Sequence, residues 1–383
     1  MNLNRKRGLA MRPNSYTMII RSLIAVLAVF FTLADFNSCS GPSKPKDVKY
    51  NLYVGATHFY ASPEDSSFNR IYIYDADSLT LLDSIWQAHY AQDVAVSPDG
   101  RWLFVLDFTL THGPRTLWKI NAQTRQVAWS RSGRSGRLRF QDNGGVLLAG
   151  NDVLDPEDGS ILRHLSDSLV VLWGPGSGTK VAATVRGSLT EYGYDSVVTA
   201  VDVTSGERSG RFVAHLPSGL PLDHFFTARL HPDQRRVLAI GVLGSVYNSW
   251  FVVGDLLTGQ TLFTYRINFP RGEIAINSDS SLAVFTDPGV QGFGESGIPY
   301  LIDLRTYGVI TPPPADLALA AQVRFLPDNR RIVTAPAAEH IWSGGPVDVL
   351  DVATLKRQKR VWPTGSTYPT PPSVGGIGIG PRP

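Results

Sequence analysis

The chain has 383 residues, of which 43% are hydrophobic and 18% charged, and its mean hydropathy is close to zero. This composition is typical of a globular protein and excludes a chain that is mostly disordered or embedded in a membrane. The net charge of +3 comes from residues 1–38, which hold five basic residues and one acid, so that 31 basic and 32 acidic residues remain. A basic surface for nucleic acid is therefore not expected.

The N-terminal segment has the composition of an export signal. A basic start is followed by an uncharged apolar run at residues 22–34. This run is shorter than the ~20 apolar residues that a membrane-spanning helix needs, and its length suits the hydrophobic part of a signal peptide. The sequence leaves open whether Met1 or Met11 is the start of translation.

Cys39 is the single cysteine and follows the apolar run closely. An exported protein with one cysteine has no internal disulfide, so this thiol needs another explanation. Its position resembles the cleavage site of bacterial lipoproteins, in which the cysteine becomes the lipid-modified first residue, although Phe36 and Asn37 depart from the usual small residues. We predict a lipoprotein-type signal peptide at 1–38, lipidation of Cys39 and a flexible tether at 39–49. The alternatives are cleavage nearby without lipidation and an uncleaved anchor.

From residue 50 onward a two-part phrase recurs. Its first part is an apolar strand, a tight polar turn and a second apolar strand, clearest at residues 94–105. Pro presets φ in such turns and Asp, Asn or Gly tolerates the bend, while the alternation of apolar residues indicates antiparallel strands. The turns lie at 97–100, 141–144, 174–177, 231–234, 277–280 and 326–329.

The second part is a strand that ends in a short polar side chain before a small turn. A carboxylate there can accept hydrogen bonds from the backbone amides of the following turn. We therefore interpret these residues as structural rather than as a ring of metal ligands. They are Asp75, Asn121, Asp155, Asp202, Asp255, Asp303 and Asp351.

Seven second parts accompany only six turns of the first kind, and the missing copy is divided between the chain ends. Residues 376–383 match the inner strand and turn, and residues 51–55 match the strand that should follow. Pairing these segments would close a ring without open edges. The sequence therefore predicts an all-β fold over residues 50–383, a seven-bladed β-propeller of four-stranded antiparallel blades closed by the N- and C-terminal strands.

These residues resemble the YVTN-type seven-bladed propellers, which are related to the WD-repeat propellers. The resemblance rests on the Ser-Pro-Asp-Gly turn at 97–100, on the Leu-Phe-Val that follows it and on Ile-Tyr-Asp strand ends such as 73–75. It implies the fold but not the activity, because the family includes binding proteins, surface proteins and a minority of enzymes.

Function is expected on the face that carries the long connections, here called the long-loop face, because variable loops on a rigid scaffold usually bind ligands. The loops from second to third strand are expected at 57–69, 107–116, 186–196, 241–249, 287–299 and 335–346. Aromatic groups among polar ones suit a ligand- or protein-binding surface. The candidate binding residues are Tyr60, His112, Tyr192, Tyr194, His224 and Trp342.

Two alternatives use other side chains. A metal-dependent, lactonase-like hydrolase would hold a divalent ion at the channel mouth with His58, His112, His224 and His340, although their spacing is not that of a local metal motif. An anion could bind Arg139, Arg229 and Arg324, which share one position of the inner strands. Such arginines more often pair with carboxylates of neighbouring blades.

We therefore expect a non-catalytic ligand- or protein-binding or scaffolding propeller of the bacterial cell envelope. No catalytic residue and no cofactor are predicted. The expected location is the periplasm or the outer membrane, and the protein is expected to contact the membrane through the lipid anchor only. We expect a monomer. A purely structural envelope protein remains a third hypothesis.

Overall fold

A computed structural model describes residues 48–57, 70–86, 90–108, 115–134, 136–141, 145–172, 178–185, 196–268, 272–287, 298–310, 320–336, 345–363 and 373–383. Residues 48–383 form one compact unit. The predicted signal peptide and Cys39 lie outside the described residues. In the described ranges, no helix is long and apolar enough to cross a membrane.

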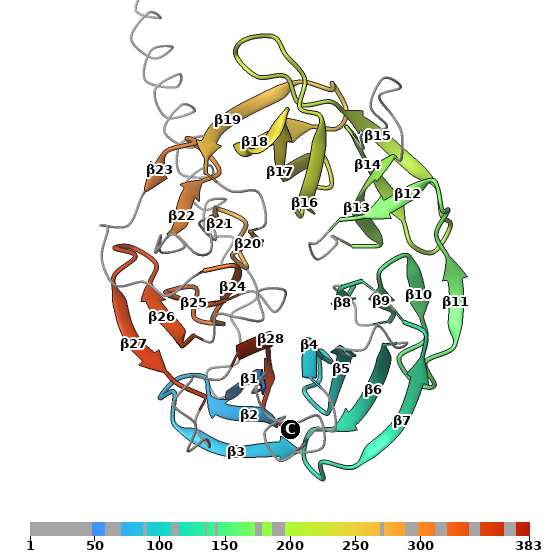
Figure 1. The fold of residues 1–383 in the computed structure, drawn as a ribbon, viewed down its shortest axis with the longest axis vertical. Helices are drawn as coiled ribbons and strands as arrows, with labels where there is room; N and C mark the ends of the chain where they lie inside the picture. Colours follow the sequence, from blue (N-terminus) through green and yellow to red (C-terminus); the bar gives the residue numbers. More distant parts are fainter. Residues whose placement is uncertain are drawn as a thin grey trace, which may run out of the picture. The chain divides into compact units, whose positions relative to one another are not determined.

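The described strands form seven four-stranded antiparallel sheets, the blades, which follow one another around a central axis (Figure 1). Blade 1 contains β28 (Ser373–Pro381), β1 (Tyr50–Thr57), β2 (Arg70–Asp75) and β3 (Leu81–Trp86). Blade 2 contains β4 (Tyr90–Val96), β5 (Trp102–Phe108), β6 (Thr116–Asn121) and β7 (Val127–Ser132). Blade 3 contains β8 (Leu138–Phe140), β9 (Leu147–Ala149), β10 (Asp152–Leu154) and β11 (Ile161–His164).

The remaining four blades repeat this order from the inner to the outer strand. Blade 4 contains β12 (Leu169–Val171), β13 (Lys180–Val185), β14 (Val197–Asp202) and β15 (Arg208–Phe212), and blade 5 contains β16 (His224–Leu230), β17 (Arg236–Leu243), β18 (Ser245–Asp255) and β19 (Thr261–Ile267). Blade 6 contains β20 (Ile274–Ile276), β21 (Leu282–Asp287), β22 (Ile298–Asp303) and β23 (Val309–Ile310), and blade 7 contains β24 (Gln322–Phe325), β25 (Arg331–Ala335), β26 (Val347–Asp351) and β27 (Arg357–Val361). The predicted seven-bladed propeller is confirmed.

The ring closes as the sequence predicts. The C-terminal strand β28 is the inner strand of blade 1 and pairs with β1, with Gly378 opposite Tyr53. Arg382 fixes the chain end, since its amide donates to the carbonyl of Lys49 at 2.8 Å and its guanidinium bonds the Asp75 carboxylate at 2.5 Å. The two chain ends therefore form one blade, and their pairing closes the ring.

The short polar residues that end the third strands have the structural role expected of them. At Asp255, Oδ1 accepts the amides of Leu257 and Thr258 at 2.8 and 3.0 Å, and Asn121 accepts the corresponding amides of Gln123 and Thr124. Asp75, Asp155, Asp202, Asp303 and Asp351 also accept turn amides two or three residues further on. These side chains are thus committed to turns on the face opposite the long loops, here called the short-turn face.

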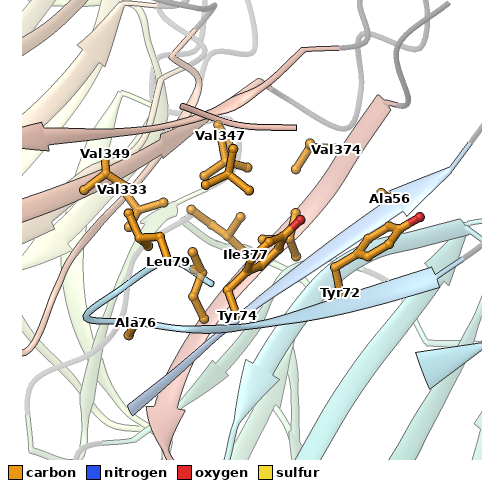
Figure 2. Packing of buried hydrophobic residues seen from close by; sticks show 14 of the residues in the cluster. Ala56, Tyr72, Tyr74, Ala76, Leu79, Val333, Val347, Val349, Val374 and Ile377 are labelled. Carbon is orange, nitrogen blue, oxygen red and sulfur yellow. The ribbon is translucent and has the colours of Figure 1, made fainter. Parts of the chain in front are cut away.

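Apolar side chains fill the spaces between neighbouring blades. Figure 2 shows this at the closure, where Val333 and Val347 of blade 7 pack with Tyr74 and Leu79 of blade 1. Ile377 of the closing strand is fully buried in the same cluster. Each sheet is buried on both faces because a blade lies on either side, which explains why the second and third strands are apolar almost throughout.

Close packing at the closure predicts that Gly380→Ala is destabilising. A Cβ at Gly380 would overlap the side chain of Val96 in blade 2, and overpacking of this kind costs about 1–3 kcal/mol. Gly308→Ala is the matched control, because its Cβ would meet only Thr306 Oγ1 at 3.4 Å. Urea denaturation should show a lower midpoint for Gly380→Ala alone. Equal midpoints for both variants would contradict the described closure.

Candidate functional site

Most of the predicted binding residues lie outside the described residues. This holds for Tyr60, His112, Tyr192, Tyr194 and Trp342 among the binding candidates, and for His58 and His340 among the metal candidates. Their roles stay predictions. His224 is the member of both sets that the structure describes, at the start of β16 on the long-loop face.

His224 lies in an aromatic and acidic corner of blade 5. Its imidazole meets the ring of Phe226 edge to face, with the ring centroids 4.7 Å apart. The register of β16 against β17 shifts between Phe225 and Thr227. His224 and Phe226 are both only half-buried, whereas Phe225 between them is buried in the blade. The irregularity thus places an imidazole and an aromatic ring together at the end of the inner strand.

The expected long loop at 241–249 is instead a tight hairpin. Strand β17 continues to Leu243 and β18 begins at Ser245, with Gly244 at φ 73° between them. The Gly244 amide donates to Asp223 Oδ2 at 2.5 Å. The amide group of Asn248 donates to the Leu243 carbonyl at 3.0 Å. The hairpin is therefore held to the residue that precedes His224, and the register of β18 against β17 shifts between Val242 and Leu243.

Tyr247 lies at this tip with 63% of its surface exposed. Behind it, Trp250 packs against the core cluster between blades 4 and 5 and donates from Nε1 to Asn248 Oδ1 at 3.1 Å. An exposed tyrosine on a stiff support loses little conformational entropy when it is covered. Chemically, the corner suits binding through apolar contact and hydrogen bonds.

A second polar group lines the channel, two residues before the arginine position that the sequence analysis singled out. In five of the inner strands this earlier position carries a buried polar or charged side chain, at most 7% exposed. The five are Asp93, Arg137, Thr227, Glu273 and Gln322.

Asp93 links blade 2 to blade 3. Its Oδ2 accepts the amide of Leu138 at 2.9 Å and receives the guanidinium of Arg139 at 3.1 Å, while its Oδ1 accepts the amide of Val94 at 3.0 Å. Asp93 is fully buried. One carboxylate thus satisfies a backbone donor of the next inner strand and the arginine beside it.

The same device recurs between blades 6 and 7. Glu273 Oε2 accepts the amide of Val323 at 3.3 Å and the guanidinium of Arg324. Between blades 7 and 1 an amide side chain takes the place of the acid, since Gln322 Oε1 accepts the amide of Ile377 at 3.3 Å. Three junctions therefore share one contact, from a polar side chain to the backbone of the following blade.

One further contact crosses the channel. Arg139 Nη2 of blade 3 lies 3.5 Å from Glu273 Oε1 of blade 6, although β8 and β20 stand on opposite sides of the central axis (Figure 1). Asp93, Arg139, Glu273 and Arg324 form one chain of alternating charges, here called the cross-channel network.

The network keeps its glutamate ionised. Burial raises the pKa of the Glu273 carboxyl, but Arg324, Arg139 and Arg137 more than offset this effect and lower the pKa from 4.5 to about 2. Burial lowers the pKa of Arg139 despite the opposing effect of Asp93. For Arg324 the burial effect is exceeded by Glu273, and the pKa is raised.

These contacts bear on the predicted anion site. Arg139 and Arg324 pair with carboxylates of other blades, as arginines at this position often do, so an anion would have to displace Asp93 or Glu273. Arg229 of β16 is half-buried at the equivalent position and also interacts with other groups. The sequence analysis missed the two acids, although comparing the inner strands two residues earlier would have found both of them.

The described part of the chain contains only one of the four histidines predicted to bind a metal, His224. No group of three or more His, Cys, Asp or Glu side chains within it is placed to hold a metal ion. Three of the four predicted ligands lie elsewhere, so this alternative stays a prediction.

The fold defines the protein as a seven-bladed β-propeller. No protein-family model matches the chain, and no curated protein matches it either. Among solved structures it is similar to Kuenenia stuttgartiensis hydrazine synthase, at 14% identity and a TM-score of 0.50 over 68% of this chain and 76% of that one. TolB from Acinetobacter baumannii (14% identity, TM-score 0.47, 87% and 67% covered) and a nidogen/laminin complex (10%, 0.46, 86% and 98%) are also similar. At these identities the likeness concerns the fold alone.

Glu273→Gln should destabilise the protein in a pH-dependent way. The carboxylate of Glu273 has a lower pKa in the folded state than its ordinary 4.5. Its contribution is therefore fully present above that pH and is lost as the pH falls toward 2. Removing one partner of a buried ion pair costs about 3–5 kcal/mol. The loss should be largest near neutral pH and should shrink in acid.

The exposed Glu207 provides the matched control. Glu207→Gln removes the same charge from a surface turn and should leave the free energy of unfolding nearly unchanged at both pH values. Chemical denaturation at pH 7 and pH 3 measures the difference. A gap between Glu273→Gln and the unsubstituted protein that is the same at both pH values would rule out an ionised Glu273 as the cause.

Proposed function

We propose that this propeller is a non-catalytic binding or scaffolding module of the bacterial cell envelope. The leader at 1–38 and the position of Cys39 support export and a lipid anchor, and the turn pattern at 97–100 supports a relationship to the YVTN-type repeats. The partner would be an envelope protein or a small ligand that binds the long-loop face.

The observation that carries the proposal is the hairpin tip beside His224, which hydrogen bonds tie to Asp223. The exposed side chain of Tyr247 contributes little to the stability of the fold. Hydrogen bonds from Gly244 to Asp223 and from Asn248 to Leu243 nevertheless hold the tip in place. Exposed aromatic side chains on rigid supports are common anchors of protein interfaces. The candidates Tyr60, His112, Tyr192, Tyr194 and Trp342 would extend this surface around the same face.

Tyr247→Ser should weaken partner binding. Loss of an anchoring aromatic side chain typically lowers affinity about tenfold or more, so immobilised protein should capture less of its partner from envelope extract, as quantified by mass spectrometry. Leu257→Ser is the control, because Leu257 is even more exposed, at 78%, but lies in a turn of the short-turn face. Captured proteins that are unchanged by Tyr247→Ser would contradict a binding role for the hairpin.

Cys39→Ser should abolish lipid attachment to the protein. Without the thiol at residue 39 no lipid can be attached there. Isolation of the protein from cells grown with labelled palmitate checks this consequence. A variant that still carries label, or an unsubstituted protein without it, would refute the lipid anchor while leaving the binding face untested by that result.

A further inference from the structure

A cavity lies between blades 2 and 3 on the short-turn face, away from the proposed binding corner. Its volume is about 180 Å³, and its walls include Trp102, Phe104, Phe140, Lys119 and Glu157. The ring of Phe104 meets that of Phe140 edge to face, with centroids 5.2 Å apart. The space is therefore lined by aromatic rings and by two charged groups of each sign, because Asp99 and Arg101, which pair with each other, also line it.

The ammonium group of Lys119 is buried at this cavity. The Lys119 side chain is only 3% exposed, and its Nζ stands 4.3 Å from the centroid of the Trp102 ring. Nζ donates to the carbonyl of Glu157 at 3.3 Å and pairs with its carboxylate at 3.1 Å. The Glu157 side chain is 80% exposed. The carboxylate that neutralises the buried ammonium group therefore belongs to a side chain on the surface.

Equivalent positions in other blades show which of these contacts belong to the repeat itself. At two other junctions an arginine that begins the second strand donates to a carbonyl of the next blade, Arg236 to Leu304 at 3.1 Å and Arg331 to Asp77 at 2.8 Å. In blade 2 this position holds Trp102. Lys119 of the neighbouring strand supplies the bond to the next blade instead.

Folding therefore accounts for the contact between Lys119 and the Glu157 carbonyl. It also accounts for the aromatic walls, since Phe104, Trp102 and Phe140 belong to the apolar core between blades 2 and 3. It does not require the open volume or the exposed carboxylate. A pair between an exposed acid and a cation contributes little to stability, because water and salt screen it. A ligand carboxylate that excludes water would form a stronger charge-assisted hydrogen bond with the same ammonium group.

We propose that this cavity binds a small aromatic carboxylate, whose anionic group replaces Glu157 at Lys119 Nζ. Its ring would lie against Trp102 and Phe140, in the tilted or offset arrangements that aromatic groups favour. The volume is below the roughly 300–1,000 Å³ of pockets for drug-sized molecules, which limits the ligand to about one ring. The site is separate from the long-loop face and does not depend on the function proposed for it.

Benzoate is the probe, and its uncharged analogue benzamide is the comparison. Binding to the purified full-length chain in detergent is followed by tryptophan fluorescence, since Trp102 forms part of the wall. We expect saturable binding of benzoate with a dissociation constant on the order of 1 mM and none of benzamide.

Two variants test the geometry. Glu157→Gln removes the competing carboxylate at an exposed position and keeps the carbonyl, so benzoate should bind about two- to fivefold more tightly. Lys119→Gln keeps a donor for that carbonyl but loses the charge, so benzoate binding should be lost. Thermal unfolding of each variant shows whether it is folded.

The proposal is overturned if neither the unsubstituted chain nor Glu157→Gln binds benzoate or phenylacetate saturably below about 10 mM. Unchanged benzoate affinity in a folded Lys119→Gln would overturn it equally. Because Glu157 is exposed, the Glu157→Gln arm remains decisive even if Lys119→Gln fails to fold.

Discussion

The inner wall of this propeller depends on a contact between a polar side chain of one blade and a backbone amide of the next. An inner strand is paired on one side only, so its other edge presents donors that must find partners once they are buried. Asp93, Glu273 and Gln322 supply acceptors for Leu138, Val323 and Ile377. The contact fixes the height of one blade relative to the next, because each acceptor reaches a single amide. It also commits a carboxylate to a buried position, and that charge needs a counterion.

The arginines of the channel follow from this requirement. A buried carboxylate without a cation would be strongly destabilising, and Arg139 and Arg324 are placed one residue beyond the amides that Asp93 and Glu273 accept. The contact of Arg139 with Glu273 then joins blades 3 and 6, which are not neighbours in the ring. Buried ion pairs are weak evidence for stability as such, but they penalise alternative registers in which the charges would be unpaired. The central positions of the inner strands thus serve the ring, which leaves loops and blade junctions for binding.

Much of the fold could be predicted because each blade repeats the same local chemistry. The Asp-capped turns, exemplified by Asp255, and the pairing of β28 with β1 are visible in sequence, since they need only turn residues and a count of repeats. The sequence predicts a loop around Gly244, but the structure has a hairpin there. Contacts of Asp223 and Asn248 hold this hairpin, and such contacts do not follow from the period of the repeat. The contact of Arg139 with Glu273 depends on the width of the ring and on two rotamers. Asp93 and Glu273, by contrast, occupy the same position of their inner strands, so an alignment of these strands in the sequence would have found them.

A repeat protein contains its own control for what folding demands, and departures from the repeat are therefore informative. At two junctions Arg236 and Arg331 donate to a carbonyl of the next blade. Where Trp102 stands in place of that arginine, Lys119 makes the contact from another strand, and a cavity lies beside it. Tyr247 is a departure of the other kind, since it adds an exposed ring to β18, which is longer than the third strands described in the other blades. Neither departure is explained by stability, because an open cavity forfeits packing contacts and an exposed ring buries nothing. The binding roles proposed for the two places would account for both departures.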